Sequence, residues 1–140
     1  MEKDKIWKDI IGYENIYKVS SSGDILIIRT NKIKKAKINR DGYLSITLTK
    51  NKKQKSFLIH RIVANAFIPN PENKCQINHK NAIRNDNNKE NLEWCTAKEN
   101  TNYKYKNKET KIFIYLSDAK TLIAEYNTKD IIIKRITLTN

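Results

Sequence analysis

The chain has 140 residues, with 28 Lys and Arg against 15 Asp and Glu, and a formal net charge of +13. This length predicts one compact unit with a small appendage, and the few Gly and Pro, three and two residues, exclude a collagen-like or Pro-rich linker protein. The N-terminal M-E-K-D-K-I-W carries charges of both signs without an apolar stretch behind it, and no apolar run approaches membrane length, so we expect a soluble intracellular protein with no signal peptide and no membrane partner.

A turn between two short strands is predicted near the N-terminus. The sequence S-S-S-G-D at Ser20–Asp24 consists of turn-forming residues. The flanking segments Tyr17–Val19 and Ile25–Ile28 have the aromatic and β-branched composition of strands.

A basic tract follows these strands. Between Asn31 and Phe57 the chain has nine Lys or Arg residues but one acid, Asp41. Lysines that only keep a protein soluble are spread more evenly along the chain. The concentration therefore predicts a surface for a polyanionic partner, most often nucleic acid, and Asp41-Gly42 predicts a turn within it.

The clearest strand is predicted at Tyr43–Thr49, and a turn at Asn51–Lys53 leads back into a second strand at Lys55–Ile59. One face of the first strand is apolar and the other is hydroxylated and flanked by lysine. Such a ribbon fits a DNA groove, and an ordinary solvated sheet face explains the pattern equally well, so both interpretations stay open. The alternating residues are the apolar Leu44, Ile46 and Leu48 and the hydroxylated Ser45, Thr47 and Thr49.

Two helices are predicted after this ribbon. The segment Arg61–Phe67 directs its apolar residues to one side, and two prolines shortly after it end the helix. The sequence T-A-K-E at Thr96–Glu99 is a capping box, which predicts a helix from about Ala97 to Lys106.

The C-terminal part predicts a β-hairpin. Its strands are Ile112–Leu116 and Thr121–Tyr126, joined by S-D-A-K, and an apolar stretch follows at Ile131–Ile133. Pairing between copies through the edge of this hairpin would give a homodimer.

The two cysteines, Cys75 and Cys95, form no C-x-x-C pair, and their spacing to the two histidines fits no zinc finger. Two free thiols in a reducing compartment are therefore expected. For His60 we expect a structural role, with its ring donating to backbone at the start of the helix.

The second histidine, His79, lies in the most polar stretch of the chain. It ends a predicted strand, C-Q-I-N-H. Asn91 lies twelve residues further on and opens a second predicted strand, N-L-E-W-C, and Asn100 lies nine residues beyond, in the capped helix. The first strand, the second strand and the helix thus each contribute one polar side chain.

This pattern resembles the HNH nuclease family and its ββα-metal fold. The matching segments are H-R-I-V-A-N-A-F-I-P-N-P-E-N-K, then I-N-H, then N-L-E-W-C-T-A-K-E-N. Upstream, W-K-D-I-I-G-Y-E-N-I-Y-K-V-S-S-S-G-D-I is similar to the modular element that often precedes such nuclease domains. Several separate motifs in the family's order make the resemblance specific, and it covers roughly residues 6–105.

The resemblance implies an α+β fold: a small antiparallel N-terminal sheet, a ββα-metal nuclease core and a C-terminal β-hairpin. It suggests a basic, β-rich DNA-binding element at 1–55, the nuclease core at 56–107, and the hairpin with a truncated DNA-binding element at 108–140.

The implied activity is hydrolysis of DNA phosphodiester bonds with one divalent cation, Mg²⁺ or Mn²⁺. His79 is the implied general base, because an imidazole accepts a proton from water near neutral pH. Asn78 and Asn100 are the implied metal ligands, since hard cations accept amide oxygens, and Asn91 is implied to brace the loop so that the histidine stays aimed.

Two departures from the family's pattern concern this site. Many relatives have Asp where this chain has Asn78, and the K-N-A-I-R after the histidine replaces the frequent K-D-G-N-K. A neutral ligand predicts weaker binding of the cation. Asp86 is the candidate in the loop to replace the missing carboxylate.

Double-stranded DNA is the expected partner, bound in the cytoplasm of a host cell at its nucleoid. Two alternatives to an active nuclease stay open: a DNA-binding protein of HNH descent whose catalysis has decayed, and a nucleoid or RNA-binding protein, which leaves the spacing of His79, Asn91 and Asn100 unexplained. The residues expected to contact DNA are Lys32, Lys34, Lys35, Lys37, Arg40, Lys50, Lys52, Lys53, Lys80, Arg84, Lys98 and Lys104.

Overall fold

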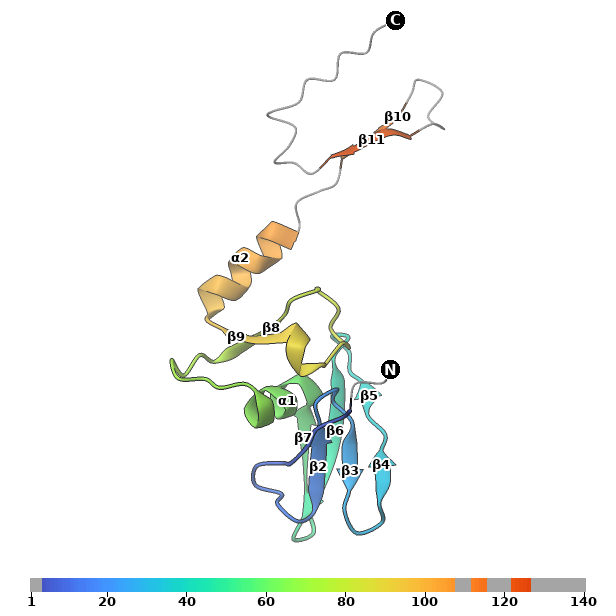
Figure 1. Ribbon diagram of the computed structural model, residues 1–140, viewed down its shortest axis with the longest axis vertical. Coiled ribbons are helices and arrows are strands. Elements are labelled where there is room, and N and C mark those ends of the chain that lie inside the picture. The colour runs from blue at the N-terminus through green and yellow to red at the C-terminus, as the bar shows by residue number, and fades with distance from the viewer. Residues whose placement is uncertain (1–3, 108–111, 116–121, 127–140) are drawn as a thin grey trace, which may run out of the picture. The chain divides into compact units, whose positions relative to one another are not determined.

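A computed structural model describes residues 4–107, 112–115 and 122–126, with side chains as far as residue 103. The fold is α+β, as predicted (Figure 1). In chain order the first seven strands are β1 (Trp7–Asp9), β2 (Tyr17–Ser20), β3 (Ile25–Ile27), β4 (Lys32–Lys34), β5 (Lys37–Ile38), β6 (Leu44–Lys50) and β7 (Lys53–Leu58). Helix α1 (Ile59–Phe67), strand β8 (Gln76–His79), the 3-10 helix η1 (Lys89–Asn91), strand β9 (Leu92–Cys95) and helix α2 (Ala97–Asn107) follow.

Residues 1–100 form one compact unit and residues 101–140 a second. In the second, β10 (Ile112–Tyr115) and β11 (Leu122–Tyr126) pair antiparallel, which confirms the predicted hairpin. The apolar stretch 131–133 lies outside the described residues. Among the helices that the structure describes, none has the length and apolarity needed to span a bilayer.

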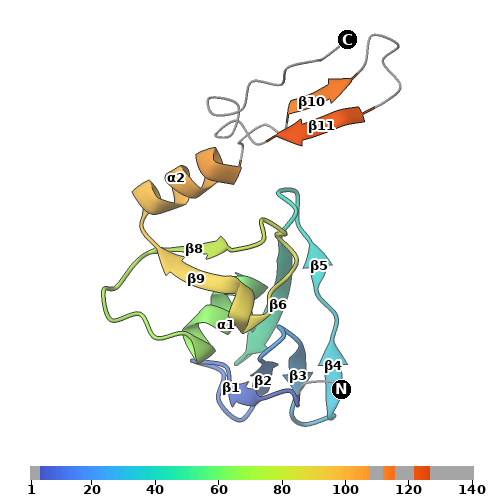
Figure 2. The ribbon, with the colours of Figure 1, turned by 45° about the horizontal axis from the view of Figure 1, so that its top comes forward.

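Three antiparallel sheets build the first unit. Strands β1 to β4 form a meander, β5 to β7 form a second sheet, and β8 pairs with β9. The basic tract contains two short strands, β4 and β5, that the sequence pattern does not predict, because lysine occupies most of their positions. Figure 2 shows β4 and β5 one after the other along one side of the first unit.

The predicted β6–β7 ribbon is present, although β7 begins at Lys53, two residues before the predicted Lys55, and ends at Leu58, one residue before the predicted Ile59. Ile46 and Leu48 are buried while Thr47, between them, is exposed, as expected for side chains that alternate between the two faces of a strand. Thr47 and Ser56 face each other across the two strands and share a hydrogen bond of 2.9 Å. Asn51 and Lys52 both have positive φ, 52° and 61°, so the turn has the type I′ form that suits a two-residue hairpin.

One hydrophobic core runs through the whole first unit. Val19 and Ile25 come from the first sheet, Leu48 from the second and Val63 from α1, and each is at most 1% exposed. Leu92 of β9 belongs to the same cluster. The domain division after residue 55 stays a prediction, and packing is continuous across that point.

Helix α1 begins at Ile59, two residues earlier than the predicted Arg61, and therefore includes His60. Its buried side chains lie on one face and pack against β2, β6, β7, β8 and β9. Helix α2 has the predicted capping box: Thr96 Oγ1 accepts from the amide of Glu99 at 3.1 Å, and Glu99 Oε2 accepts from the amide of Thr96 at 2.8 Å.

Candidate active site

The predicted general base, His79, ends β8 and is 6% exposed. Its imidazole lies 5.1 Å from that of His60 and 5.9 Å from the ring of Tyr43, measured between ring centroids. Its Nε2 is 3.0 Å from Oδ1 of Asn87. These four side chains, His79, Asn87, His60 and Tyr43, are called the histidine cluster below.

The hydrogen bond to Asn87 determines which nitrogen of His79 is basic. With Oδ1 of Asn87 facing the ring, Nε2 carries the hydrogen and donates it, while Nδ2 of the same amide is buried without a hydrogen-bond partner among the described residues. In the neutral ring the lone pair then lies on Nδ1. Asn87 was not expected to act here; it is one of several asparagines in a polar loop, and nothing in the sequence separates it from its neighbours.

His60 lies in the first turn of α1 and is 7% exposed. The expectation that its ring donates to backbone is wrong, because Nδ1 has no hydrogen-bond partner among the described residues. Burial, the largest cause, acts together with the neighbouring His79 and Arg61 to lower the pKa of His60 from 6.5 to about 4. His60 is therefore neutral at physiological pH and adds no charge next to His79.

Asn91 holds the loop between β8 and η1. Its Nδ2 donates to Oδ1 of Asn81 at 2.9 Å and to the carbonyl of Asp86 at 2.8 Å, and its Oδ1 accepts from the amide of Asn81 at 3.0 Å. The residue after Asp86 is Asn87. Asn91 thus ties the loop together by three hydrogen bonds, whereas the hydrogen bond to the imidazole comes from Asn87. A catalytic role for Asn91 stays a prediction.

The predicted metal ligands lie in a second group of side chains. Asn78 donates through Nδ2 to Oε1 of Glu93 at 2.9 Å, and Asn100 of α2 donates through Nδ2 to Oε1 of Gln76 at 2.7 Å. Asn78 and Glu93 are directly opposite in the β8–β9 ladder. These four residues, Gln76, Asn78, Glu93 and Asn100, are called the amide cluster below.

The two clusters occupy opposite faces of β8. Alternation along a strand puts Gln76 and Asn78 on one face and His79 on the other, and no hydrogen bond between described residues joins the imidazole to Asn78 or Asn100. The predicted convergence of all four side chains is therefore seen only in part. The two clusters are linked through the backbone, because Asn78 and His79 are consecutive at the end of β8 and their Cα atoms are about 3.8 Å apart.

The donor atoms of the amide cluster fit a hard divalent cation. Both amide NH₂ groups are engaged, and the Oδ1 atoms of Asn78 and Asn100 accept no hydrogen bond from the described residues, which leaves two oxygens of the kind that Mg²⁺ accepts. The described residues contain no group of three or more His, Cys, Asp or Glu that could hold a metal. The expected substitute carboxylate, Asp86, instead accepts from Asn81 within the loop, at 2.7 Å.

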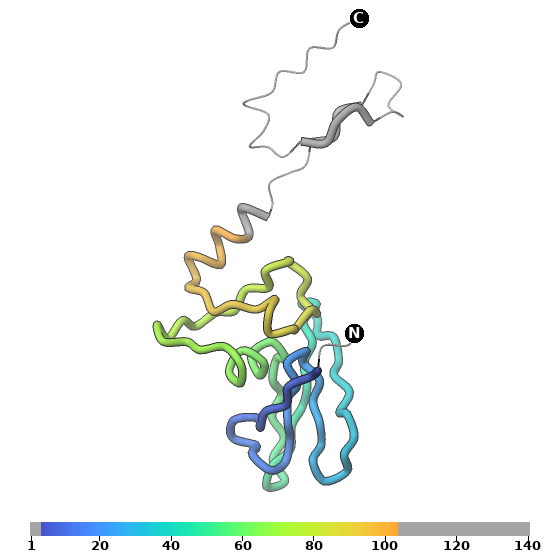
Figure 3. The backbone as a smooth tube through the Cα atoms, viewed as in Figure 1, coloured from blue at the N-terminus to red at the C-terminus, as the bar shows by residue number. Residues whose placement is uncertain are grey.

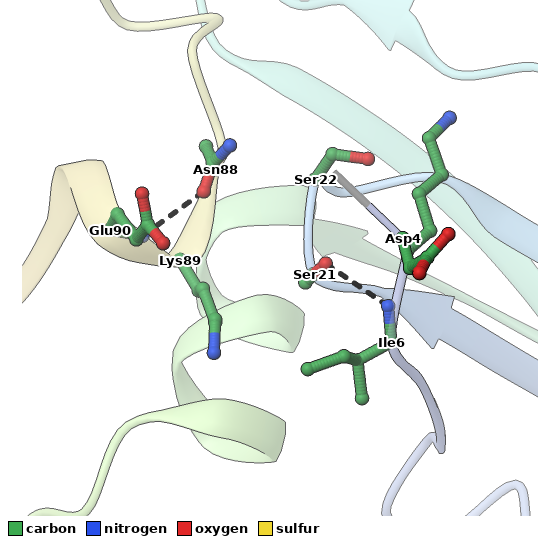
Figure 4. Close-up of a pocket in the computed structure, with 8 residues that line it drawn as sticks. Asp4, Ile6, Ser21, Ser22, Asn88, Lys89 and Glu90 are labelled. Carbon is green, nitrogen blue, oxygen red and sulfur yellow. Dashed lines mark hydrogen bonds between the residues drawn. The ribbon is translucent and has the colours of Figure 1, made fainter. Parts of the chain in front are cut away.

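The N-terminal strands contact the loop that carries Asn87. Lys89 donates its amide to the carbonyl of Ser21 at 2.8 Å. A Cβ on Gly23, whose φ is +93°, would lie 3.1 Å from Cβ of Asn87. Figure 3 shows the yellow backbone segment before β9 passing close to the blue N-terminal strands, and Figure 4 shows Asn88 and Glu90 on one side of a pocket with Ser21 and Ile6 on the other.

The basic residues predicted to bind DNA lie on the surface, with Lys34 half-buried; the side chain of Lys104 lies outside the described residues. Lys34, Lys35 and Lys37 line a shallow pocket with Ser45 and Thr47.

Two of these basic residues are engaged within the protein. Lys50 donates to the carbonyl of Gly12 at 2.7 Å. Arg84 donates to the carbonyl of Asp41 at 2.6 Å and lies over the ring of Tyr43, which joins the loop between β8 and η1 to the turn before β6. Both cysteines are free, Cys75 exposed and Cys95 buried.

His79 ends the first strand of the β8–β9 hairpin, Asn78 precedes it, Asn91 directly precedes the second strand, and helix α2 follows the hairpin. This arrangement defines a nuclease site of the ββα-metal class. Known proteins agree with this assignment. Residues 57–102 match the HNH endonuclease family, and residues 6–49 match the NUMOD4 motif. The chain belongs to the HNH endonuclease family.

The chain is similar to the DNA endonuclease I-HmuI of Bacillus phage SP01, with 36% identity over 127 residues that cover 91% of this chain and 71% of the phage protein. A solved structure of that HNH homing endonuclease, described for DNA binding and cleavage, matches with a TM-score of 0.70 and 36% identity over 82% of this chain and 64% of its own. The HNH endonuclease L245 of Acanthamoeba polyphaga mimivirus is 40% identical over 99 residues, 71% of this chain and 30% of the viral protein.

Proposed function

We propose that this chain is an HNH endonuclease that hydrolyses phosphodiester bonds in double-stranded DNA with one divalent cation, Mg²⁺ or Mn²⁺, and with His79 as general base. The observation that carries the proposal is the hydrogen bond from Nε2 of His79 to Asn87. It holds the ring in one tautomer, with the basic Nδ1 available to a water molecule. Positioned general bases contribute rate factors of about 10² to 10⁴.

Asn78 and Asn100 are the residues that would hold the cation through Oδ1. When bound, a divalent cation stabilises the negative charge that develops on the leaving oxygen. A phosphodiester at the end of β8 would lie where the two clusters adjoin. Neutral amide ligands have the further advantage that they do not repel a polyanionic substrate.

The basic strands supply the approach for DNA. Tyr43, within the basic tract, contacts the imidazole rings of His60 and His79. Arg84, in the loop after β8, donates to the carbonyl of Asp41, two residues before Tyr43. A duplex that binds the lysines of β4 and β5 would therefore extend along this surface to His79. The proposed place of action is the nucleoid in the cytoplasm of a host cell, where the DNA substrate is. Pairing of two copies through the β10–β11 hairpin would place a second active site on the duplex.

A plasmid nicking assay tests the proposal. Supercoiled plasmid is incubated with purified protein and Mg²⁺ or Mn²⁺, with a chelator as control. We expect metal-dependent conversion to the open-circular form, and His79→Ala lowers its rate at least about 100-fold while gel-shift binding persists. Asn65→Ala, an exposed asparagine on α1, is the matched control and retains the wild-type rate.

The alternative, a decayed module that only binds DNA, is favoured by one observation: the neutral Asn78 in place of the carboxylate of many relatives. The same assay separates the two. Tight binding without cutting at any concentration of Mg²⁺ or Mn²⁺ refutes the enzyme and supports the module.

A further inference from the structure

The amide of Asn78 faces one charged group, the carboxylate of Glu93. An asparagine amide has two ends of similar size, and only the oxygen can ligate a cation. A carboxylate is acceptor-only when ionised, so Nδ2 must be the atom that faces Oε1 of Glu93, at 2.9 Å. The opposite end, Oδ1, is thereby directed away from Glu93.

Asn100 contacts a second amide instead of a carboxylate. Its Nδ2 donates to Oε1 of Gln76 at 2.7 Å, and this contact joins α2 to β8 on the face that carries Asn78. Both amides therefore have their donor ends engaged by residues of the β8–β9 hairpin. The Oδ1 atoms of both amides accept no hydrogen bond from the described residues.

We propose that Glu93 is a positioning residue for the divalent cation: its carboxylate orients the amide of Asn78 so that Oδ1 faces the ion, and it supplies the negative charge that Asn78 lacks. Gln76 orients Asn100 in the same manner without a charge. This inference rests on the proposed function. It identifies Glu93 as the residue that allows the neutral Asn78 to act as a cation ligand. It also assigns the missing carboxylate to the opposite strand, in place of Asp86 in the loop.

Glu93 and Asn78 also form a cross-strand pair, so a purely structural role is the competing explanation. A structural pair affects the stability of the β8–β9 hairpin and leaves the affinity of the folded protein for a cation unchanged. Residues behind a metal ligand typically change metal affinity about 10- to 100-fold when they are replaced. Cation affinity is thus the measurement that separates the two roles.

The test uses the full chain bound to a duplex with non-hydrolysable phosphorothioate linkages. Free Mn²⁺ is measured by electron paramagnetic resonance during a titration, and the folded state of each variant is checked by thermal unfolding. We expect Glu93→Gln to weaken Mn²⁺ binding about 10- to 100-fold, while affinity for the duplex without metal does not fall. Glu72→Gln, which removes the same charge from an exposed loop residue, leaves Mn²⁺ affinity at the wild-type value.

A double-mutant cycle sharpens the test. In Asn78→Asp the ligand is a carboxylate, which has two equivalent oxygens and needs no orientation, so only the charge of Glu93 still acts on the cation. Glu93→Gln should therefore weaken Mn²⁺ binding less in the Asn78→Asp background than in the wild type. This difference isolates the orientation of the amide, because general electrostatic attraction is lost in both backgrounds.

Two results overturn the inference: unchanged Mn²⁺ affinity in Glu93→Gln, or an equal loss in both backgrounds. A failure of the proposed function looks different. In that case the wild-type complex itself binds no Mn²⁺ and nicks no plasmid, whereas here the wild type does both and only the effect of Glu93 is absent.

Discussion

Replacement of the buried His60 by Phe should remove part of the protein's sensitivity to acid. The folded state keeps this imidazole neutral, because burial and the neighbouring His79 and Arg61 lower its pKa to about 4. In the unfolded chain the same ring binds a proton as the pH falls below 6.5. Phe keeps a flat ring against Tyr43 and His79 and has no polar atom that needs a partner.

The direction and size of the effect follow from proton linkage. Between the two pKa values the unfolded state binds more protons than the folded state, so the free energy of unfolding falls as the pH falls. Above pH 6.5, the pKa of His60 in the unfolded chain, the ring is neutral in both states and the free energy of unfolding does not change with pH through this residue. Acidification from pH 7 to pH 5 costs the wild type about 2 kcal/mol through His60 alone.

Urea unfolding at a series of pH values measures this difference. Hydrogen bonds to backbone amides lower the pKa values of Glu14 and Glu99, so both proteins lose some stability in acid, and this loss cancels when the variant is compared with the wild type. We expect the stability difference to shift in favour of His60→Phe by about 2 kcal/mol between pH 7 and pH 5. Parallel stability curves across that range would refute the assignment of a neutral, buried His60.

Three further changes are predicted to have defined effects. Gly23→Ala adds a Cβ at positive φ and 3.1 Å from Asn87, and should cost about 1 to 2 kcal/mol in urea unfolding; an unchanged midpoint would contradict the close approach. Thr96→Ala removes the capping box of α2 and should cost about 1 kcal/mol, with Thr96→Ser close to wild type in the same measurement. Lys34→Glu combined with Lys35→Glu should weaken DNA binding equally for all sequences and flatten its salt dependence in gel-shift titrations; a loss at one sequence alone would argue against backbone contacts.

The elements that depend on neighbouring residues could be predicted from the sequence. The capping box at Thr96 specifies its own two hydrogen bonds, and the strict alternation in β6 follows from one buried face. The start of α1 was placed two residues late, because Ile59 continues the apolar pattern of the preceding strand as well as that of the helix. Strands β4 and β5 were missed because lysine at most positions hides the apolar alternation.

The contacts that complete the site could not be predicted, because they join segments far apart in the chain. His79 and Asn91 stand out by residue type and spacing. The partners Asn87 and Glu93 do not, since an asparagine among asparagines and a glutamate on a strand each have many surface roles. Only the β8–β9 register places Glu93 opposite Asn78, and only the fold of the loop brings Asn87 to the imidazole.

The contact of Gly23 and Ser21 with the Asn87 loop bears on how such proteins are assembled in evolution. The N-terminal strands share the hydrophobic core with α1 and β9, and they also form the floor under the loop that aims the imidazole. Grafting a foreign N-terminal module onto this nuclease should therefore disturb the loop that carries Asn87 even if the new module recognised DNA well. We expect recombination between relatives to succeed only where the two halves have matching surfaces at this junction.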